Sequence, residues 1–258
     1  MGIKKYKNPP VVEAWIDFRF EYGEQPPEWN GMVATDFLKS FNEFKKEEYP
    51  ALFKKAIKVN EKGSIVSEAD LLVRLKAFNK ANDRCLQIEQ NLLVYNILRN
   101  KNVTWPGFSV LLSEAMPFYQ AYIDKFHPIK AKTVLHYRDH VAIPFIDNKI
   151  EPKDYFEIYP KVPEDKIGNM VDYSLSLILS DICENGVASF SVRTEPEISD
   201  IEVTQSKLLF IIDWDVQSRI SFACENLDSC GTWLNLAHSG INKAFESCLT
   251  ERCRSLFY

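Results

Sequence analysis

The sequence predicts an α+β fold in which a largely antiparallel, curved sheet carries long helices packed on one face. Three observations lead to this fold class. Segments with alternating apolar and polar residues outnumber segments with helical spacing. Most connections between the predicted strands are too short for the helical crossover that parallel strands need. The 258 residues are 46% apolar, which is enough for a full hydrophobic core.

The first half begins with a predicted strand at residues 12–21, where apolar side chains at even positions alternate with mostly polar ones at odd positions. A turn-rich segment follows, and the apolar spacing over residues 32–44 predicts a helix against the sheet. Residues 53–98 contain short apolar alternations, separated by turn-forming residues at 62–63 and 79–83. This pattern predicts a meander of antiparallel strands.

A second helix is predicted to follow. Thr104 can cap it, Pro106 suits its first turn, and apolar residues recur on one face from Phe108 to Phe126. Pro117 within this segment predicts a kink. The aromatic residues on this face are predicted to lie in the core.

The second half follows the same plan loosely. Strands are predicted at residues 133–143, 171–179, 187–193 and 208–216, with a short helical piece near 154–159.

The last element is the clearest predicted helix. Thr232 or Ser229 can cap it, and an apolar stripe runs from Leu234 to Leu256. His238 lies beside this stripe, and we expect it to be partly buried with its hydrogen bonds satisfied.

The order of strand, helix, several strands and helix occurs about twice. It is explained either by a diverged internal duplication, with halves 1–130 and 131–258, or by one long, curved sheet that grips the helices. No linker rich in glycine, serine or proline separates two cores. We therefore predict a single domain over residues 1–258.

The formal net charge of −5 argues against binding by neutralisation of many phosphates, because that mode needs a surplus of lysine and arginine. We therefore do not expect a nucleic-acid partner. No run of about 18 apolar residues suggests a membrane span, and the N-terminus lacks a signal-peptide pattern. We expect a cytoplasmic protein.

The six cysteines include no CxxC pair, and several occupy apolar positions, which predicts reduced thiols in the core. The alternative is a zinc site built from the last four cysteines and His238, but their spacings match no common zinc motif. We expect no metal and no cofactor.

Three titratable or cationic side chains, His136, Arg138 and His140, fall on one face of the strand at residues 134–143. They could form a surface that binds anions or transfers protons. We favour a solvated sheet face without a function, because residue identity alone does not establish a perturbed pKa.

Two carboxylates, Asp213 and Asp215, share one face of the strand at residues 208–216. Paired carboxylates can bind a divalent cation or divide acid and base roles between them. No third carboxylate or lysine occurs at a diagnostic spacing, so we favour cross-strand salt bridges.

Glu13, Asp17 and Arg19 lie on the polar side of the first strand, together with Trp15. If that strand neighbours the two strands above, all of these charges share one surface. Such a face suits binding to another protein through complementary charges and aromatic side chains, although plain solvent-facing sheet would have the same pattern. The candidate residues that face a ligand or partner are Asp17, Arg19, His136, Arg138, His140, Asp213 and Asp215.

The chain contains, in this order, NPPVVEAWIDFRF, LQIEQNLLVYNIL followed by WPGF, LHYRDHVAIPF, LLFIIDWDVQ and WLNLAHSGINKAFESCLTERCRSLF. By their order and spacing, these segments together resemble a sporadically distributed bacterial family of conserved hypothetical proteins of similar length, which has no established activity. The patchy distribution of this family implies exchange between genomes, and hence an accessory role such as defence or toxin neutralisation. The chain departs from the family pattern L-R-Y-x-N-R-I at His136, Asp139 and His140, which argues against a role that needs permanent positive charge at positions 136 and 140.

No P-loop, dinucleotide fingerprint, HExxH motif, EF-hand or nucleophile elbow occurs. Together with the resemblance, this favours a non-enzymatic binding protein whose macromolecular partner is another protein. The alternative is a hydrolase or small-ligand-binding protein that uses the polar residues of the two later strands, His136, Arg138, His140, Asp213 and Asp215.

Overall fold

The computed structural model describes residues 6–44, 50–59, 65–100, 104–145, 150–159, 174–196 and 207–258. Its strands are β1 (Val11–Glu21), β2 (Ala51–Val59), β3 (Ile65–Phe78), β4 (Arg84–Glu89), β5 (Leu92–Leu98), β6 (Lys130–Pro144), β7 (Ser174–Ser180), β8 (Gly186–Pro196), β9 (Lys207–Ser218) and β10 (Phe222–Ala223). Its helices are α1 (Gly31–Lys39), α2 (Phe108–Phe126), α4 (Leu227–Cys248) and α5 (Glu251–Arg254), with short 3-10 turns η1 (Asn42–Phe44), η2 (Pro152–Asp154) and η3 (Ser255–Phe257).

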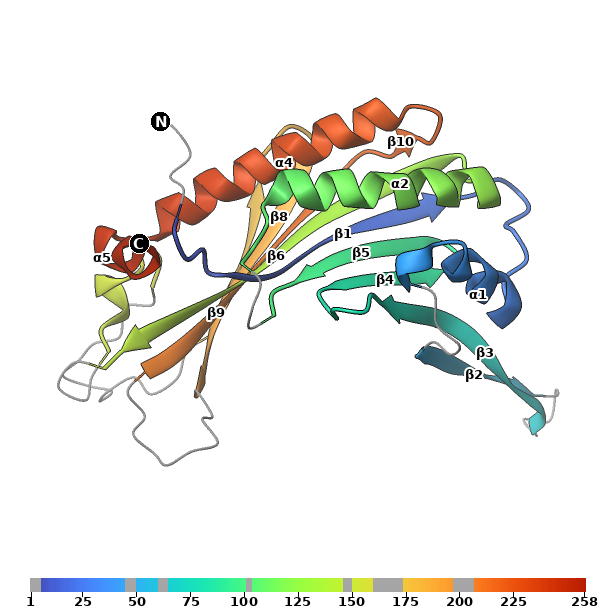
Figure 1. Cartoon of the computed structure of the whole chain (residues 1–258), viewed down its shortest axis with the longest axis horizontal. Coiled ribbons are helices and arrows are strands. Elements are labelled where there is room, and N and C mark those ends of the chain that lie inside the picture. The colour runs from blue at the N-terminus through green and yellow to red at the C-terminus, as the bar shows by residue number, and fades with distance from the viewer. Residues whose placement is uncertain are drawn as a thin grey trace.

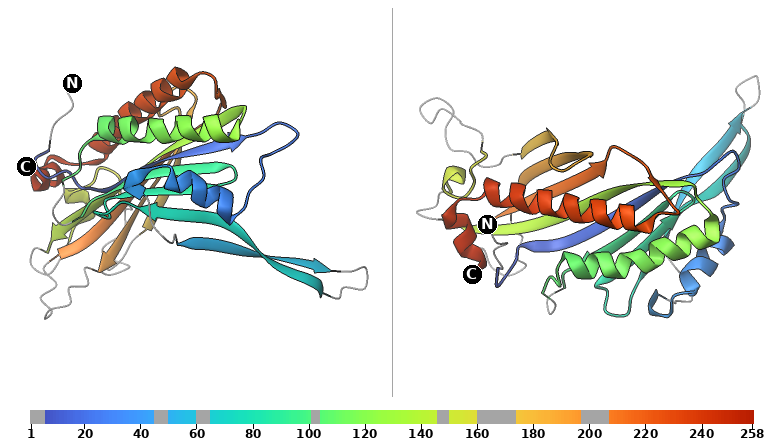
Figure 2. Two further views of the ribbon diagram at one scale, coloured as in Figure 1. Left: turned by 45° about the vertical axis from the view of Figure 1, so that its right-hand side comes forward. Right: turned by 90° about the horizontal axis from the view of Figure 1, so that it is seen from above.

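The described strands form one antiparallel sheet in the order β2-β3-β4-β5-β1-β6-β9-β8-β7, and β10 pairs with the beginning of β6. The sheet twists and arches beneath α2 and α4, which lie on the same face (Figures 1 and 2). The predicted α+β class and the antiparallel sheet are therefore confirmed.

The two central strands, β1 and β6, divide the sheet into halves with the same order of elements. In the first half, β2 to β5 run from the outer edge inwards to β1, and α2 follows. In the second half, β7 to β9 run from the other edge inwards to β6, and α4 follows. The described part of the second half contains no counterpart of β2.

Apolar side chains at even positions of β1 point towards the helices and form the core. The ring of Phe18 lies 4.5 Å from that of Tyr119 of α2, and Phe20 stacks on Tyr122 with a ring separation of 4.1 Å. Both tyrosines are fully buried, which confirms the prediction that the aromatic face of this helix belongs to the core. None of the six cysteines forms a disulfide, and five of them are buried, as predicted for core thiols.

His238 on α4 joins the two helices to the sheet. Its Nδ1 lies 2.9 Å from the hydroxyl of Tyr137, its Nε2 lies 2.9 Å from Nδ2 of Asn242, and its ring stacks on Phe108 at 4.1 Å. Burial lowers the pKa of His238 to about 4. A neutral ring that donates from Nδ1 and accepts at Nε2 satisfies both neighbours, so the prediction of a satisfied, half-buried histidine is confirmed.

The predicted start of the second helix is wrong. Thr104 and Pro106 lie before α2, which begins at Phe108 after Gly107. Gly107 has a φ of 101°, a conformation that glycine adopts without steric cost, and the chain turns into the helix there. The helix continues through Pro117.

The predicted caps of the last helix are also wrong. Asn226 caps α4, and its side-chain oxygen accepts a hydrogen bond of 3.1 Å from the backbone N–H of Ser229. The helix begins before Thr232 because Cys230 and Trp233 extend its buried stripe towards the N-terminus.

Other predicted boundaries shift by a few residues. The first helix ends at Lys39, and the rest of the predicted segment contains only the 3-10 turn η1. Of the short helical piece expected near 154–159, only Asp154 is helical, as the last residue of the turn η2, and Phe156 forms a β-bridge with Leu249 instead. The predicted turn at 62–63 and strand residues 171–173 lie outside the described residues.

The backbone of α4 passes very close to the backbone of the turn that precedes β8. A Cβ atom added at Gly240 would lie 2.5 Å from the carbonyl oxygen of Ile182, a distance that real side chains do not tolerate. Gly231 of the same helix has no such neighbour within 4 Å.

In the described part of the chain, no helix is both long and apolar enough to cross a lipid bilayer.

We predict opposite effects of the same substitution at these two glycines. Gly240→Ala should lower the free energy of unfolding by about 1–3 kcal/mol, because the helix or the turn must move. Gly231→Ala should raise it by up to about 1 kcal/mol, because alanine favours the helix more than glycine does. Urea unfolding of both variants measures this difference, and a neutral Gly240→Ala would show that the close approach is absent.

Candidate functional site

The sheet face opposite the helices carries a row of polar side chains at its centre. Odd positions of β1, even positions of β6 and odd positions of β8 and β9 share this face, because paired residues of neighbouring strands point to the same side. The register places Trp15, His136, Asp215 and Ser189 in one row across four strands. We call this the central polar face; its members are Glu13, Trp15, Asp17, Arg19, His136, Arg138, His140, Ser189, Arg193, Asp213 and Asp215.

His136 occupies the middle of the central polar face. Its Nδ1 lies 2.5 Å from Oδ1 of Asp215, and its Nε2 lies 3.4 Å from Oδ2 of Asp17. The second contact is an ion pair rather than a well-aligned hydrogen bond, because Nε2 satisfies no hydrogen-bond geometry. Burial alone would lower the pKa of His136, but the two carboxylates outweigh it and raise the pKa above its ordinary value.

Asp17 and Arg19 extend this contact along β1. Asp17 is only 7% exposed, and burial opposes its ionisation, but His136 and Arg19 hold the pKa of its carboxyl below the usual range. Nη2 of Arg19 donates to Oδ2 of Asp17 over 3.0 Å, while the rest of the Arg19 side chain is half exposed. The buried carboxylate of Asp17 thus lies between the imidazole of His136 and the guanidinium of Arg19.

Trp15 covers His136 from solvent. The two rings are parallel within 7° and their centroids are 4.5 Å apart. The guanidinium of Arg138 lies 5.9 Å from the Trp15 ring, close enough for a cation–π contact. Two residues of β6 therefore hold the indole of Trp15, on β1, in one orientation.

Asp213 links three strands through two arginines. Arg138 donates from Nε to Oδ1 over 2.7 Å, and Arg193 donates from Nη1 to Oδ2 over 2.6 Å. Arg138 also lies 3.8 Å from the carboxylate of Glu13. The predicted cross-strand salt bridges of this strand are therefore present.

His140 stands apart from this network. Its ring forms no ion pair with a carboxylate among the described residues, and burial, together with the charge of Arg138, lowers its pKa. The structure thus brings six of the seven candidate residues into direct contact with another member, and it places His140 on the same face without such a contact.

Sequence analysis missed several members of this network. Asn96 of β5 donates to Glu13 over 2.9 Å and accepts from Gln87 of β4 over 3.0 Å, which carries the polar row beyond β1. Ser189 donates to Asp215 over 3.2 Å. The signal for Ser189 and Arg193 was the alternation in VASFSVR, which points these side chains to one face, but its strand neighbour was unknown.

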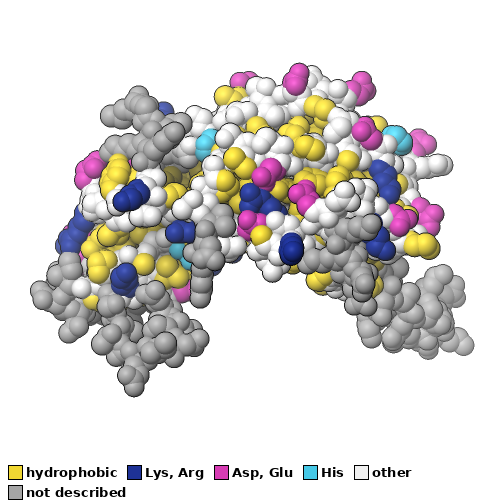
Figure 3. Space-filling view, viewed as in Figure 1, with side chains coloured by type: hydrophobic (Ala, Val, Ile, Leu, Met, Phe, Trp, Pro, Cys, Tyr) yellow, Lys and Arg dark blue, Asp and Glu magenta, His cyan; other side chains and the backbone are white. Residues whose placement is uncertain are grey.

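The sheet arches with α2 and α4 on its outer side (Figure 1; Figure 3 shows the same view with side chains). The central polar face, which is opposite the helices, therefore lies on the inner side of the arch. No group of three or more histidine, cysteine, aspartate or glutamate side chains within the described ranges is placed to hold a metal ion.

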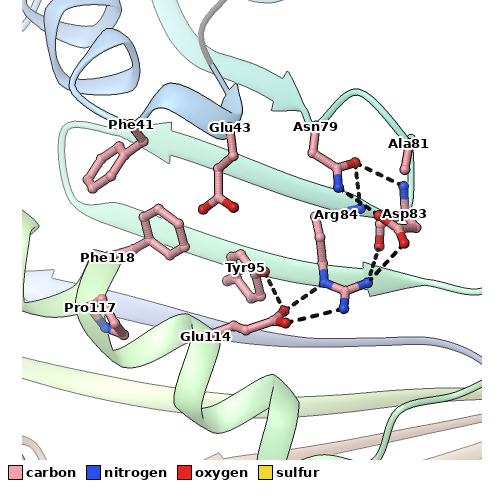
Figure 4. Close-up of a pocket in the computed structure, with 10 residues that line it drawn as sticks. All are labelled: Phe41, Glu43, Asn79, Ala81, Asp83, Arg84, Tyr95, Glu114, Pro117 and Phe118. Carbon is pink, nitrogen blue, oxygen red and sulfur yellow. Dashed lines mark hydrogen bonds and ion pairs between the residues drawn. The ribbon is translucent and has the colours of Figure 1, made fainter.

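A pocket of about 490 Å³ lies at a different place, between α2, η1 and the turn from β3 to β4. Glu114 of α2 accepts hydrogen bonds of 2.6 Å from Arg84 and 2.7 Å from Tyr95, and Arg84 also pairs with Asp83 (Figure 4). Burial, reinforced by Glu114, raises the pKa of Tyr95. Because these groups bind one another, we interpret the cluster as a junction that ties α2 to the sheet.

Asp139 lies on the opposite face of β6, in the core. It is 4% exposed, and burial, with a contribution from the charge of Asp213, raises the pKa of its carboxyl to about 8. Asp139 is therefore largely protonated in the folded protein at neutral pH.

No known family model matches the chain, and no curated protein matches it either.

We predict that His136 stabilises the protein in a pH-dependent way. His136→Gln should cost about 2 kcal/mol at pH 6, because Asp17 and Asp215 lose their shared cation. The folded-state pKa of His136 is raised, so its contribution is complete below the pKa of the unfolded chain and is lost as the pH rises through the folded value. Denaturant unfolding of both proteins between pH 6 and 9 should show a shrinking difference; a constant difference contradicts the ion pairing.

We predict that Asp139→Asn removes a different pH dependence. The folded carboxyl keeps its proton up to about pH 8, whereas the unfolded chain loses it near its ordinary value. The wild-type protein should therefore lose stability relative to the variant as the pH rises from 5 to 8, and the difference should level off above that range. Parallel stability curves would show that Asp139 is not buried in its neutral form.

Proposed function

We propose that the protein is a non-enzymatic binding protein that recognises another protein through the central polar face. The observation that supports this function is the fixed arrangement of the face before any partner binds. Trp15 is stacked on His136, and Asp17, Asp213 and Asp215 each lie beside an arginine or the imidazole of His136. Such a face loses little side-chain entropy on association and presents both signs of charge in a defined pattern.

The balance of charge favours a protein over a nucleic acid as the partner. Three arginines and His136 stand against four carboxylates among the members of the central polar face. Affinity for nucleic acid needs a surplus of positive charge, which this face does not offer. We therefore expect no salt-sensitive retention of the protein on immobilised DNA or RNA.

The alternative of a hydrolase or small-ligand-binding protein has less support. A general base must reach the proton that it abstracts, and a nucleophile must lie next to that base. Here both ring nitrogens of His136 face carboxylates, and the hydroxyl of Ser189 donates to Asp215 rather than to the histidine. The pocket of Figure 4 contains none of these residues.

We also infer that the two halves, 1–130 and 131–258, descend from a duplication within a single domain. Their shared order of elements around β1 and β6 supports this inference. An accessory role in defence or toxin neutralisation is part of the proposal, and it rests on the family resemblance of the sequence.

The proposed function is tested by co-purification from the native host at endogenous levels. We expect the wild-type protein to retain a stoichiometric protein partner. Arg19→Glu, which reverses a half-exposed charge of the central polar face, should release that partner; because Arg19 also pairs with the buried Asp17, circular dichroism must show that the variant is still folded. Lys243→Glu makes the same charge reversal on the exposed face of α4 and should retain it.

Recovery of the wild-type protein alone would contradict the proposed function. A partner that is released by Lys243→Glu and kept by Arg19→Glu would place the binding surface on the helices instead.

A further inference from the structure

The two edges of the sheet differ in how well they are protected from pairing with another chain. An edge strand exposes backbone N–H and C=O groups, and natural proteins protect such edges with lysines, prolines or irregular pairing. β2 forms one edge; it contains lysines such as Lys54, and its register with β3 shifts at two places. This edge therefore has recognised protective features.

The other edge, β7, has none of these features. Its sequence, SLSLILS, contains no charged residue and no proline, and its register with β8 is continuous over all seven residues. In the part of the chain that the structure describes, β7 pairs with β8 alone. Ile178 on this strand is 82% exposed.

The two halves of the sheet also differ at their outer edges, as far as the described strands show. β3 and β7 occupy corresponding places, each three strands outwards from its central strand. β3 has a further neighbour, β2, whereas the corresponding place beside β7 holds no described strand. A strand added there would complete the same order in both halves.

The sequence of β7 is self-complementary about its central residue. In an antiparallel pair of two β7 strands centred on Leu177, each Ser174 would face Ser180 and each Leu175 would face Leu179 of the other copy. Facing residues point to the same side of the sheet, so leucines meet leucines on the helix side. On the opposite side Ile178 meets Ser176, and no charged group comes between the strands.

We propose that β7 is the interface for a second copy of this chain, with a two-fold axis at Leu177 and a sheet that continues from one copy into the other. The two-fold arrangement uses the same surface on both copies, as most homodimers do. A standard interface has about 20–30 residues on each side, many more than the seven of β7, so the dimer should be weak, with a dissociation constant of about 10 µM or higher.

A cysteine scan tests the position of the two-fold axis. Leu177→Cys places two thiols opposite each other, at the Cα separation of about 4.5–5.5 Å found in antiparallel pairs, which a disulfide can bridge. Leu175→Cys is the matched control on the same side of the strand. Its two copies would lie four residues apart along the strands, about 13 Å, which is too far. Mild oxidation of the purified proteins should cross-link the first variant and not the second, and the wild-type protein reports any cross-linking by its own cysteines.

Sedimentation velocity over a range of concentrations tests the interface without covalent bonds. Ile178→Lys places two like charges near each other across the axis and should weaken association at least about tenfold. Met32→Lys, at a residue of α1 that is 75% exposed, makes the same change far from β7 and should leave association unchanged.

The proposal is overturned if the wild-type protein remains monomeric up to high concentration, if both cysteine variants cross-link equally, or if Ile178→Lys leaves the dimer intact. Because these measurements use the purified chain alone, their outcome is independent of the partner that the central polar face is proposed to bind.

Discussion

The pairing of β1 with β6 is the interaction on which the rest of the structure depends. It runs from Val11 to Glu21 on β1, joins the two halves of the sheet, and determines which side chains meet at the centre. A shift of one residue would turn every side chain of one strand to the other face, so the register is tightly constrained by Phe18 and Phe20 in the core. The same register places His136 beside Asp17, and β9 then adds Asp215 from the other side.

The consequence is a sheet with two unlike faces. One face is closed by α2 and α4 and contains the aromatic core, while the other is held together by charges. Ion pairs on an open surface contribute little stability, but His136 and Asp17 are largely buried, with Trp15 stacked on the imidazole, whereas Asp215 is more exposed. Their main effect is to orient the side chains, and this is the property on which the proposed recognition of another protein depends.

The parts of this structure that follow from local patterns could be predicted, and the parts that depend on distant neighbours could not. Alternation along β1, β6 and β9 correctly assigned the candidate residues to faces, because a strand has a period of two whatever its neighbours. The start of α2 was missed because the φ of Gly107 is not visible in a spacing pattern. The contacts of Asn96 and Arg193 needed the strand order, which the sequence leaves open.

The account depends most directly on the charge of His136, which can be observed by NMR titration of the four histidine rings, with His136 assigned by its loss in His136→Gln. The two neighbouring carboxylates predict a pKa for His136 above its ordinary value of about 6.5, together with a lowered pKa for His238. A pKa for His136 at or below the ordinary value would mean that burial outweighs the carboxylates. Asp17 and Asp215 would then not share a charged imidazole at the middle of the central polar face.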